Sequence, residues 1–211
     1  MNFYERRILP YVLHAAMRQS RFTPYRRRVV SAAAGRVLEI GAGSGLNLPF
    51  YSATVTALIG LDPSPALLSR ARAPQHTMTA PGRPSGRPTT WLEASAEAIP
   101  LEDASLDTVV TTWTLCSIPD VSGALRDVRR VLKPSGRLLF IEHGRAREAS
   151  VRVWQDRLTP LWTRVAGGCH LNRPIDRLIE DAGFRIEQLK TDYMDGPRLM
   201  TFMYEGSARP M

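Results

Sequence analysis

The stretch VLEIGAGSGLNLPFY, residues 37–51, passes from an apolar run typical of a buried strand into a turn with three glycines. Gly41, Gly43 and Gly45 alternate with other residues, and the acidic Glu39 lies two positions before the first glycine. A strand, a glycine-rich turn and a helix start together present free backbone N–H groups and a positive dipole end. This combination favours a nucleotide-like ligand, although the glycine spacing alone is a weak signal because many turns need a positive φ.

The next apolar run ends at Asp62, about twenty residues beyond the turn, where a carboxylate can bind the two hydroxyls of a ribose. The dinucleotide-binding fingerprint needs its third glycine one position later than Gly45, where this chain has Leu46. Glu39 would also repel a pyrophosphate and attract a cation. S-adenosylmethionine, which carries a sulfonium and an ammonium group, is therefore the predicted ligand.

Strand and helix patterns alternate along the chain on both sides of this turn. Strands are expected at 36–40, 55–62, 89–94, 107–114 and 137–143, and the last two, 184–193 and 198–206, form an antiparallel hairpin. Two helices, over 3–17 and 25–34, are expected before the glycine turn, and another is expected to start directly after it. Further helices are expected over 64–72, over 119–132, in the segment that ends near 165, and over 173–182. The pattern predicts an α/β fold, a Rossmann-like doubly wound seven-stranded sheet, mostly parallel. Residues 1–34 are expected to form an N-terminal helical cap on a single unit, 35–211.

A Pro-, Gly- and Arg-rich loop over 73–88 is expected to lie at the sheet edge opposite the ligand. The composition is that of a globular protein, and the two cysteines, Cys116 and Cys169, fit a reducing cytosol. The net charge of +8 calls for an anionic partner. We interpret the cluster Arg26–Arg28 as a solvated basic face, with peripheral contact to the anionic inner face of a membrane as the alternative. Nucleic acid is not expected, since no aromatic-interleaved or zinc-finger motif is present.

The motifs EIGAGSG (39–45), LDPS (61–64) and SAEAIPLEDASLDTVVTT (95–112) resemble those of class I S-adenosylmethionine-dependent methyltransferases. The resemblance covers residues 35–143 and implies the methyltransferase fold, with S-adenosylhomocysteine as product. It places Ser95, Ala96 and Glu97 near the adenine, although the family usually has an aspartate at the position of Ser95. The full set of expected cofactor contacts is Tyr4, Glu39, Gly41, Ala42, Gly43, Gly45, Asn47, Asp62, Pro63, Ser95, Ala96, Glu97, Thr112, Thr114 and Leu115.

A narrower resemblance lies in TWTLCSIPD (112–120), IEHG (141–144), WQDRLTPLWTRVAGGCHLNRP (154–174) and EDAGF (180–184). These segments are similar to the animal thiol S-methyltransferases of the methyltransferase-like family and their bacterial relatives. The animal members carry an N-terminal membrane anchor that is not expected here. The resemblance implies a small thiol or sulfide as methyl acceptor. Two alternatives stay open: methylation of phosphatidylethanolamine or a quinone at a membrane surface, and a non-catalytic module that binds S-adenosylmethionine or membranes.

Methyl transfer from a sulfonium is an in-line displacement that depends on alignment and on exclusion of water, so an apolar, mostly closed cavity is expected. His143 is a candidate base, with a structural hydrogen bond as the alternative. Cys116 either lines the site or is a small buried hydrophobe. Trp113, Trp154, His170 and Arg173 are candidate substrate contacts, with core packing or helix capping as their other roles. No metal is predicted, because the pair Cys169 and His170 has no second ligand pair at zinc spacing.

Overall fold

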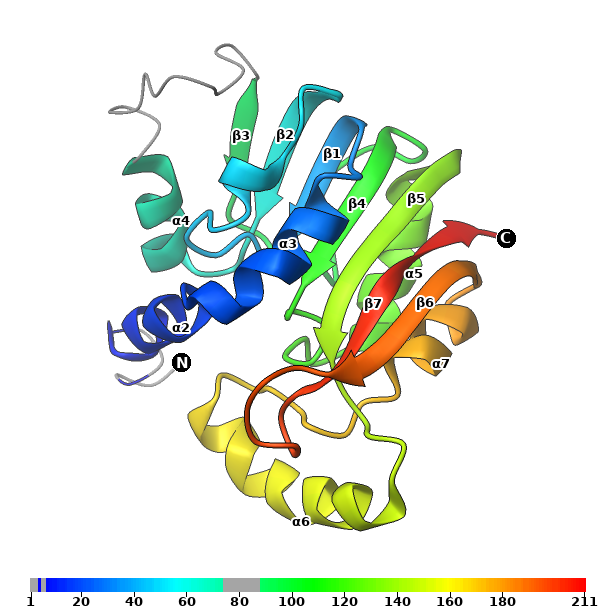
Figure 1. Ribbon diagram of the computed structural model, residues 1–211. Coiled ribbons are helices and arrows are strands. Elements are labelled where there is room, and N and C mark those ends of the chain that lie inside the picture. The colour runs from blue at the N-terminus through cyan, green and yellow to red at the C-terminus, as the bar shows by residue number, and fades with distance from the viewer. Residues whose placement is uncertain (1–3, 5–6, 74–87) are drawn as a thin grey trace.

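The computed structural model describes Tyr4 and residues 7–73 and 88–211. It contains a seven-stranded sheet of order β3-β2-β1-β4-β5-β7-β6 with helices on both faces (Figure 1). The strands are β1 (Gly35–Ile40), β2 (Val55–Leu61), β3 (Thr89–Leu92), β4 (Leu106–Thr112), β5 (Leu132–His143), β6 (Phe184–Tyr193) and β7 (Phe202–Pro210). Strands β1 to β5 pair in parallel, and β7 is antiparallel to both of its neighbours. The predicted doubly wound sheet and its hairpin are confirmed.

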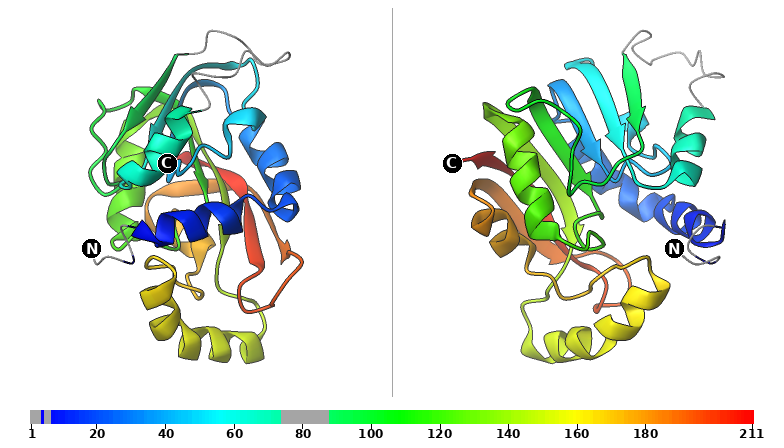
Figure 2. Two further views of the ribbon diagram at one scale, coloured as in Figure 1. Left: turned by 90° about the vertical axis from the view of Figure 1, so that its left-hand side faces the viewer. Right: turned by 180° about the vertical axis from the view of Figure 1, so that it is seen from behind.

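The helices are α2 (Leu9–Met17), α3 (Thr23–Val30), α4 (Pro65–Arg72), α5 (Val121–Val131), α6 (Ala149–Val165) and α7 (Ile175–Asp181). Two short 3-10 helices, η1 (Ser20–Phe22) and η2 (Leu48–Phe50), complete the elements. The face of the sheet that carries α3 lies opposite the face that carries α5 and α7 (Figures 1 and 2). Helix α6 lies beyond the carboxyl end of β5, away from the sheet itself (Figure 1).

The buried strands supply both halves of the core. In β5, Leu138 and Phe140 join the cluster that includes α5 and α7, whereas Leu139 and Ile141 join the cluster that includes α3. Successive side chains of a strand point to opposite faces, so a strand covered on both sides must be apolar at nearly every position. This explains why the runs that predicted the strands are continuous rather than alternating.

Three expectations about the elements were wrong. Only η2 follows the glycine turn where a helix was expected, because Pro49 and the short connection to β2 leave no room for regular helical turns. Strand β5 begins at Leu132 rather than at 137, and β7 begins at Phe202 rather than at 198. The expected loop over 73–88 falls almost wholly outside the described residues, so its position relative to the sheet stays a prediction.

The order of the strands reverses between β1 and β4, which lie side by side although β2 and β3 separate them in sequence. Ligands of open α/β sheets bind at the carboxyl ends of the strands beside such a switch point. Ile40 at the end of β1 pairs with Thr111 near the end of β4, and the glycine turn begins there. The topology thus places the turn, Glu39 and the end of β4 around one location.

Candidate cofactor and methyl-transfer site

A cavity of about 530 Å³ opens at this switch point. Most of its lining is apolar, and the polar exceptions come from the ends of β1, β2 and β4. It contains twelve of the residues expected to bind cofactor or substrate: Glu39, Gly41, Ala42, Gly43, Asn47, Asp62, Pro63, Ser95, Ala96, Thr112, Trp113 and Thr114. The volume and the few converging polar groups are typical of a small-molecule site.

The three glycines of the turn have φ of +67°, +54° and +77°, the left-handed region of backbone conformation that residues with a side chain rarely adopt. The atoms around the three positions differ. A Cβ at Gly41 would lie 2.2 Å from the Thr114 hydroxyl, and one at Gly45 would lie 2.9 Å from Leu48. A Cβ at Gly43 would meet only a backbone oxygen at 3.8 Å and would otherwise enter open space. The open space therefore lies at Gly43, whereas at Gly41 and Gly45 the missing side chain allows close packing of protein atoms, and ligand contact at the three glycines stays a prediction.

Asp62, at the end of β2, holds the glycine turn in place. One carboxylate oxygen accepts a hydrogen bond from the Gly43 N–H at 2.9 Å, and the other accepts from the Ser64 N–H at 2.8 Å. Each carboxylate oxygen has a second lone pair, so acceptor capacity remains for a ligand. Burial raises the pKa of Asp62, and the two backbone bonds oppose that rise.

Glu39 is buried at the end of β1 within a network of side-chain hydrogen bonds. Its oxygens accept from the Asn47 amide and from the Tyr51 hydroxyl, each at 2.8 Å. The same amide donates to Thr112 at 2.9 Å. Burial raises the pKa of Glu39 to about 7, although both hydrogen bonds and the nearby charge of Arg26 act to lower it.

Arg26 of α3 completes this network, a role that no sequence pattern indicated. Its Nε donates to the side-chain amide oxygen (Oδ1) of Asn47 at 3.0 Å, and its guanidinium lies 5.1 Å from the centroid of the Trp113 ring. Burial lowers the pKa of Arg26 to about 10, so the group stays cationic near neutral pH. The interpretation of Arg26–Arg28 as a solvated face was wrong at Arg26, which is buried, whereas Arg27 and Arg28 are exposed and Arg28 forms a two-bond ion pair with Glu205.

A turn after β4 forms the wall opposite the glycines. Glu142, buried on β5, accepts hydrogen bonds from the Thr111 hydroxyl and from the backbone N–H groups of Thr114 and Leu115. Burial raises the pKa of Glu142 to about 8. Trp113 adopts a left-handed φ of +52° in this turn, and its buried indole N–H has no partner among the described residues. Trp113 lines the cavity, but its indole nitrogen is enclosed by protein atoms.

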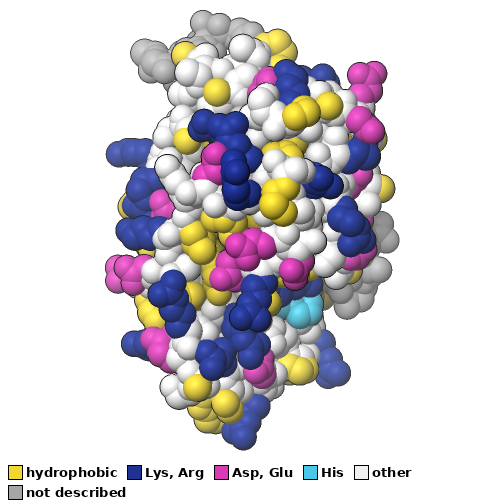
Figure 3. Space-filling model, turned by 90° about the vertical axis from the view of Figure 1, so that its right-hand side faces the viewer, with side chains coloured by type: hydrophobic (Ala, Val, Ile, Leu, Met, Phe, Trp, Pro, Cys, Tyr) yellow, Lys and Arg dark blue, Asp and Glu magenta, His cyan; other side chains and the backbone are white. Residues whose placement is uncertain are grey.

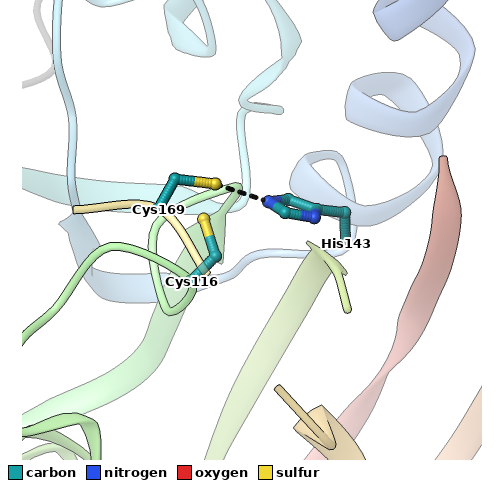
Figure 4. A group of neighbouring side chains, drawn as sticks. All are labelled: Cys116, His143 and Cys169. Atoms are coloured by element: carbon teal, nitrogen blue, oxygen red, sulfur yellow. Dashed lines mark hydrogen bonds between the residues drawn. The ribbon is translucent and has the colours of Figure 1, made fainter. Parts of the chain in front are cut away.

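His143 and Cys116 lie behind this wall rather than in the cavity lining. The Nε2 of His143 is 3.1 Å from the sulfur of Cys169, and Cys116 lies beside both side chains (Figure 4). A hydrogen bond from Cys169 and the charge of His143 lower the pKa of Cys116 despite burial. The cluster joins the ends of β4 and β5 to the segment between α6 and α7.

The chain matches a methyltransferase-domain family model over residues 38–140. It is 35% identical over 161 residues to thiol S-methyltransferase TMT1B of Rattus norvegicus, an alignment that covers 73% of this chain and 62% of the relative. The chain belongs to the S-adenosylmethionine-dependent methyltransferases. It spans less than two thirds of the length of that relative.

Two further comparisons place this methyltransferase among known proteins. Phosphatidylethanolamine N-methyltransferase of Cereibacter sphaeroides is 29% identical, with 86% of this chain and 85% of the relative covered. The crystal structure of an S-adenosylmethionine-dependent methyltransferase from Thermotoga maritima superposes with a TM-score of 0.68 at 21% identity, covering 99% and 98% of the two chains. The fold is that of class I methyltransferases, and S-adenosylmethionine is the methyl donor that family and fold imply.

The N-terminal segment of the methyltransferase covers the cavity, but with other residues than expected. Leu9, Pro10, Leu13, His14 and Met17 of α2 line it, and the His14 Nδ1 lies 2.7 Å from the Ser44 hydroxyl in the glycine turn. Ile8 and Val12 of the same segment are 45% and 49% exposed and do not belong to the cavity lining.

Tyr4 and Trp154 lie away from the cavity. The Tyr4 hydroxyl donates to the Val165 carbonyl at 2.8 Å, at the end of α6. Trp154 is 54% exposed on α6, where the Arg157 guanidinium lies 5.5 Å from its ring. The expected roles of these two residues at cofactor and substrate have no support from their positions.

The remaining expected site residues are structural neighbours of the cavity wall. Glu97 accepts from the Asp120 N–H at 2.7 Å and so joins the loop after β3 to the start of α5. Arg173 donates to the Leu115 carbonyl and caps no helix, since Pro174 occupies the N-cap of α7. The His170 N–H donates to the Cys116 carbonyl at 2.8 Å. Leu115 is fully buried.

Charge is mixed on the outer surface of the methyltransferase. Over the face shown in Figure 3, Lys and Arg side chains are interspersed with Asp and Glu. Ion pairs such as Arg209 with Glu187, at 2.7 Å, account for part of this pattern. Among the described residues, no helix is both long enough and apolar enough to span a bilayer.

Proposed function

We propose that the chain transfers a methyl group from S-adenosylmethionine to a small thiol or sulfide. The observation that supports S-adenosylmethionine as the cofactor is the buried Glu39 carboxylate in the same cavity as the open space over Gly43. A carboxylate attracts the cationic amino-acid part of the donor, and the bare backbone at Gly43 leaves room for it. The same elements would repel a pyrophosphate.

Each group around the cavity has a distinct proposed task. Asp62 binds the ribose hydroxyls with its remaining lone pairs, and Ser95 and Ala96 lie along the adenine. Asn47, held by Arg26 and Thr112, keeps the Glu39 carboxylate in place. Trp113 lines the same cavity and contributes an aromatic wall.

S-adenosylmethionine supplies an activated methyl group on a sulfonium sulfur. The chain contributes alignment and exclusion of water, for which the apolar lining from α2 is suited. The acceptor sulfur forms a bond to the methyl carbon as the bond to the donor sulfur breaks, and the thiol proton passes to solvent. Little base catalysis is required, because a few per cent of an ordinary thiol is already ionised at neutral pH.

Segment 1–34 is proposed to act as the cap of this site. Five cavity-lining residues come from α2, and Arg26 extends from α3 into the polar network. The cap therefore contributes both the apolar cover and a cation.

Similarity supports the thiol acceptor, because the thiol S-methyltransferases of rat and human are 35% and 33% identical to this chain. The competing candidate is a phospholipid amine, which the longer but weaker alignment with the Cereibacter enzyme favours. A labelled-methyl assay separates them: purified protein is offered hydrogen sulfide, alkyl thiols, and phosphatidylethanolamine vesicles in parallel. We expect label in methanethiol, from hydrogen sulfide, or in the thioethers formed from alkyl thiols. Label in phosphatidylethanolamine with none in any thiol would refute the thiol assignment.

A further inference from the structure

Three side chains with metal-binding atoms converge behind the cavity wall, although they are far apart in sequence. Cys116 follows β4, His143 is the last residue of β5, and Cys169 lies between α6 and α7 (Figure 4). Their ligand atoms all lie within 4.8 Å of one another. Cys116 and His143 are buried, with 2% and 8% of their surface exposed. The fold thus assembles a nitrogen and two sulfurs in one protected place.

The spacing of these atoms is close to that of a tetrahedral zinc site. Bond lengths of about 2.3 Å to sulfur and 2.0–2.1 Å to nitrogen put neighbouring ligand atoms roughly 3.5–3.8 Å apart. The His143 Nε2 and the Cys169 sulfur are 3.1 Å apart. Side-chain rotations that move each atom by about 1 Å or less would bring all three onto one ion.

We propose that Cys116, His143 and Cys169 form a binding site for a soft divalent ion, Zn²⁺. Two sulfurs and one imidazole are a donor set that suits this ion, and oxygen-preferring ions such as Mg²⁺ do not match it. Binding replaces the thiol protons, which pass to solvent, and involves no electron transfer. Three protein ligands leave the fourth position of the ion for water or another small ligand.

An ion bound at this site would affect the wall of the cavity, because two segments of that wall lie next to its ligands. Trp113, Thr114 and Ser117 on one side, and Ala166 and Gly167 on the other, flank the two cysteines and line the cavity. An ion held by both cysteines and by β5 would fix these two wall segments relative to the sheet. Metal binding at this cluster does not depend on which molecule accepts the methyl group.

The sequence-based expectation of no metal considered Cys169 with its neighbour His170. The structure instead directs His170 to the backbone of Cys116, where its Nδ1 lies 3.2 Å from the carbonyl oxygen. His143 takes its place next to the sulfurs. No spacing rule relates residues 116, 143 and 169, so only the fold brings this set together.

Cobalt substitution tests the site in the full-length protein. The reduced protein should bind one Co²⁺ with a thiolate-to-metal charge-transfer band, and Zn²⁺ should displace it. Cys169→Ser and Cys116→Ser each remove one of two thiolate ligands, so each should lower the intensity of that band by about half or more and weaken Zn²⁺ binding by more than about 100-fold, since losing even an outer partner of a ligand costs 10–100-fold. His170→Ala is the matched control and should keep the full band. A band of unchanged intensity in Cys169→Ser would overturn the proposal.

X-ray absorption on the zinc-loaded wild type gives a readout that needs no variant. We expect two sulfur neighbours at about 2.3 Å and nitrogen or oxygen neighbours at about 2.0–2.1 Å. A first shell without sulfur, or failure of the reduced protein to bind Zn²⁺ at all, would equally overturn the assignment. Circular dichroism of the two serine variants separates loss of a ligand from loss of the fold.

Discussion

Arg26 on α3 donates a hydrogen bond to Asn47 in the glycine turn, over 3.0 Å, and both side chains are buried. The bond connects the N-terminal segment to the network around Glu39, because the Asn47 amide also donates to that carboxylate. A buried cation and a buried anion are thus bridged by one neutral side chain. Removing either charge leaves the other without compensation, and such changes are costly.

Replacing Arg26 by Met should weaken S-adenosylmethionine binding by roughly 10- to 100-fold, since a hydrogen bond to a charged group contributes about 1.5–3 kcal/mol. Arg27→Met is the matched control, because Arg27 is the exposed neighbour on the same helix. Calorimetric titration measures both. Equal affinities in the two variants would show that the network does not support the cofactor.

Asp62 tests the ribose assignment. Asp62→Ala removes the ribose acceptor and also the two bonds that hold Gly43 and Ser64, so cofactor affinity should fall strongly. Asp62→Asn keeps one acceptor oxygen and the shape, and we expect a smaller loss. Ser64→Ala removes only a helix-cap oxygen and serves as the control. Unchanged affinity in Asp62→Ala would contradict the assignment.

The glycines should separate binding from folding. Gly43→Ala places a methyl group in open space, so we expect the melting temperature to fall little and cofactor affinity to fall sharply. Gly45→Ala places it 2.9 Å from Leu48 and 3.2 Å from Ala71, so stability should suffer more than in Gly43→Ala. Both positions share the cost of a positive φ, about 1–2 kcal/mol. Thermal melts with and without S-adenosylmethionine measure the two effects; the reverse ranking would be inconsistent with this geometry.

Glu39 should make binding depend on pH. Its pKa of about 7 in the fold lies above the ordinary 4.5, so the neutral form stabilises the ligand-free protein at low pH, and this contribution is lost as pH rises through 7. A cationic ligand prefers the ionised form. Affinity for S-adenosylmethionine should therefore rise by up to tenfold per unit as pH approaches 7 from below, and then level off.

Calorimetry at several pH values, in buffers of different ionisation enthalpy, would detect the proton released by Glu39. Glu39→Gln should bind more weakly and lose most of this dependence. A variant that keeps the wild-type slope would assign the titration to another group.

Sequence reasoning located the strands well because continuous apolar runs bounded by Gly, Pro and Asp leave few alternatives. It also found Glu39 and Asp62, whose positions follow from strand ends. It failed at Arg26, because a triplet of arginines looks alike in sequence whether one member is buried or not. Burial there depends on Phe22 and Trp113, which come from different elements.

The missing helix after the glycine turn has a similar cause. The local pattern allowed a helix, but residues 46–54 must also return the chain to β2, and Pro49 restricts its neighbour. The adjacency of His143 and Cys169 was equally inaccessible, since it depends on how the segment between α6 and α7 folds back over β5.

Strand β7 is the last strand along the chain, yet it lies between β5 and β6 in the sheet. During synthesis on the ribosome, β5 must therefore keep an unpaired edge, and β6 has no strand partner, until residues 202–210 emerge. Exposed edges of this kind invite pairing with other chains. A nascent chain stalled before Phe202 should accordingly aggregate or be degraded, whereas completion of the final strand closes the sheet in one step.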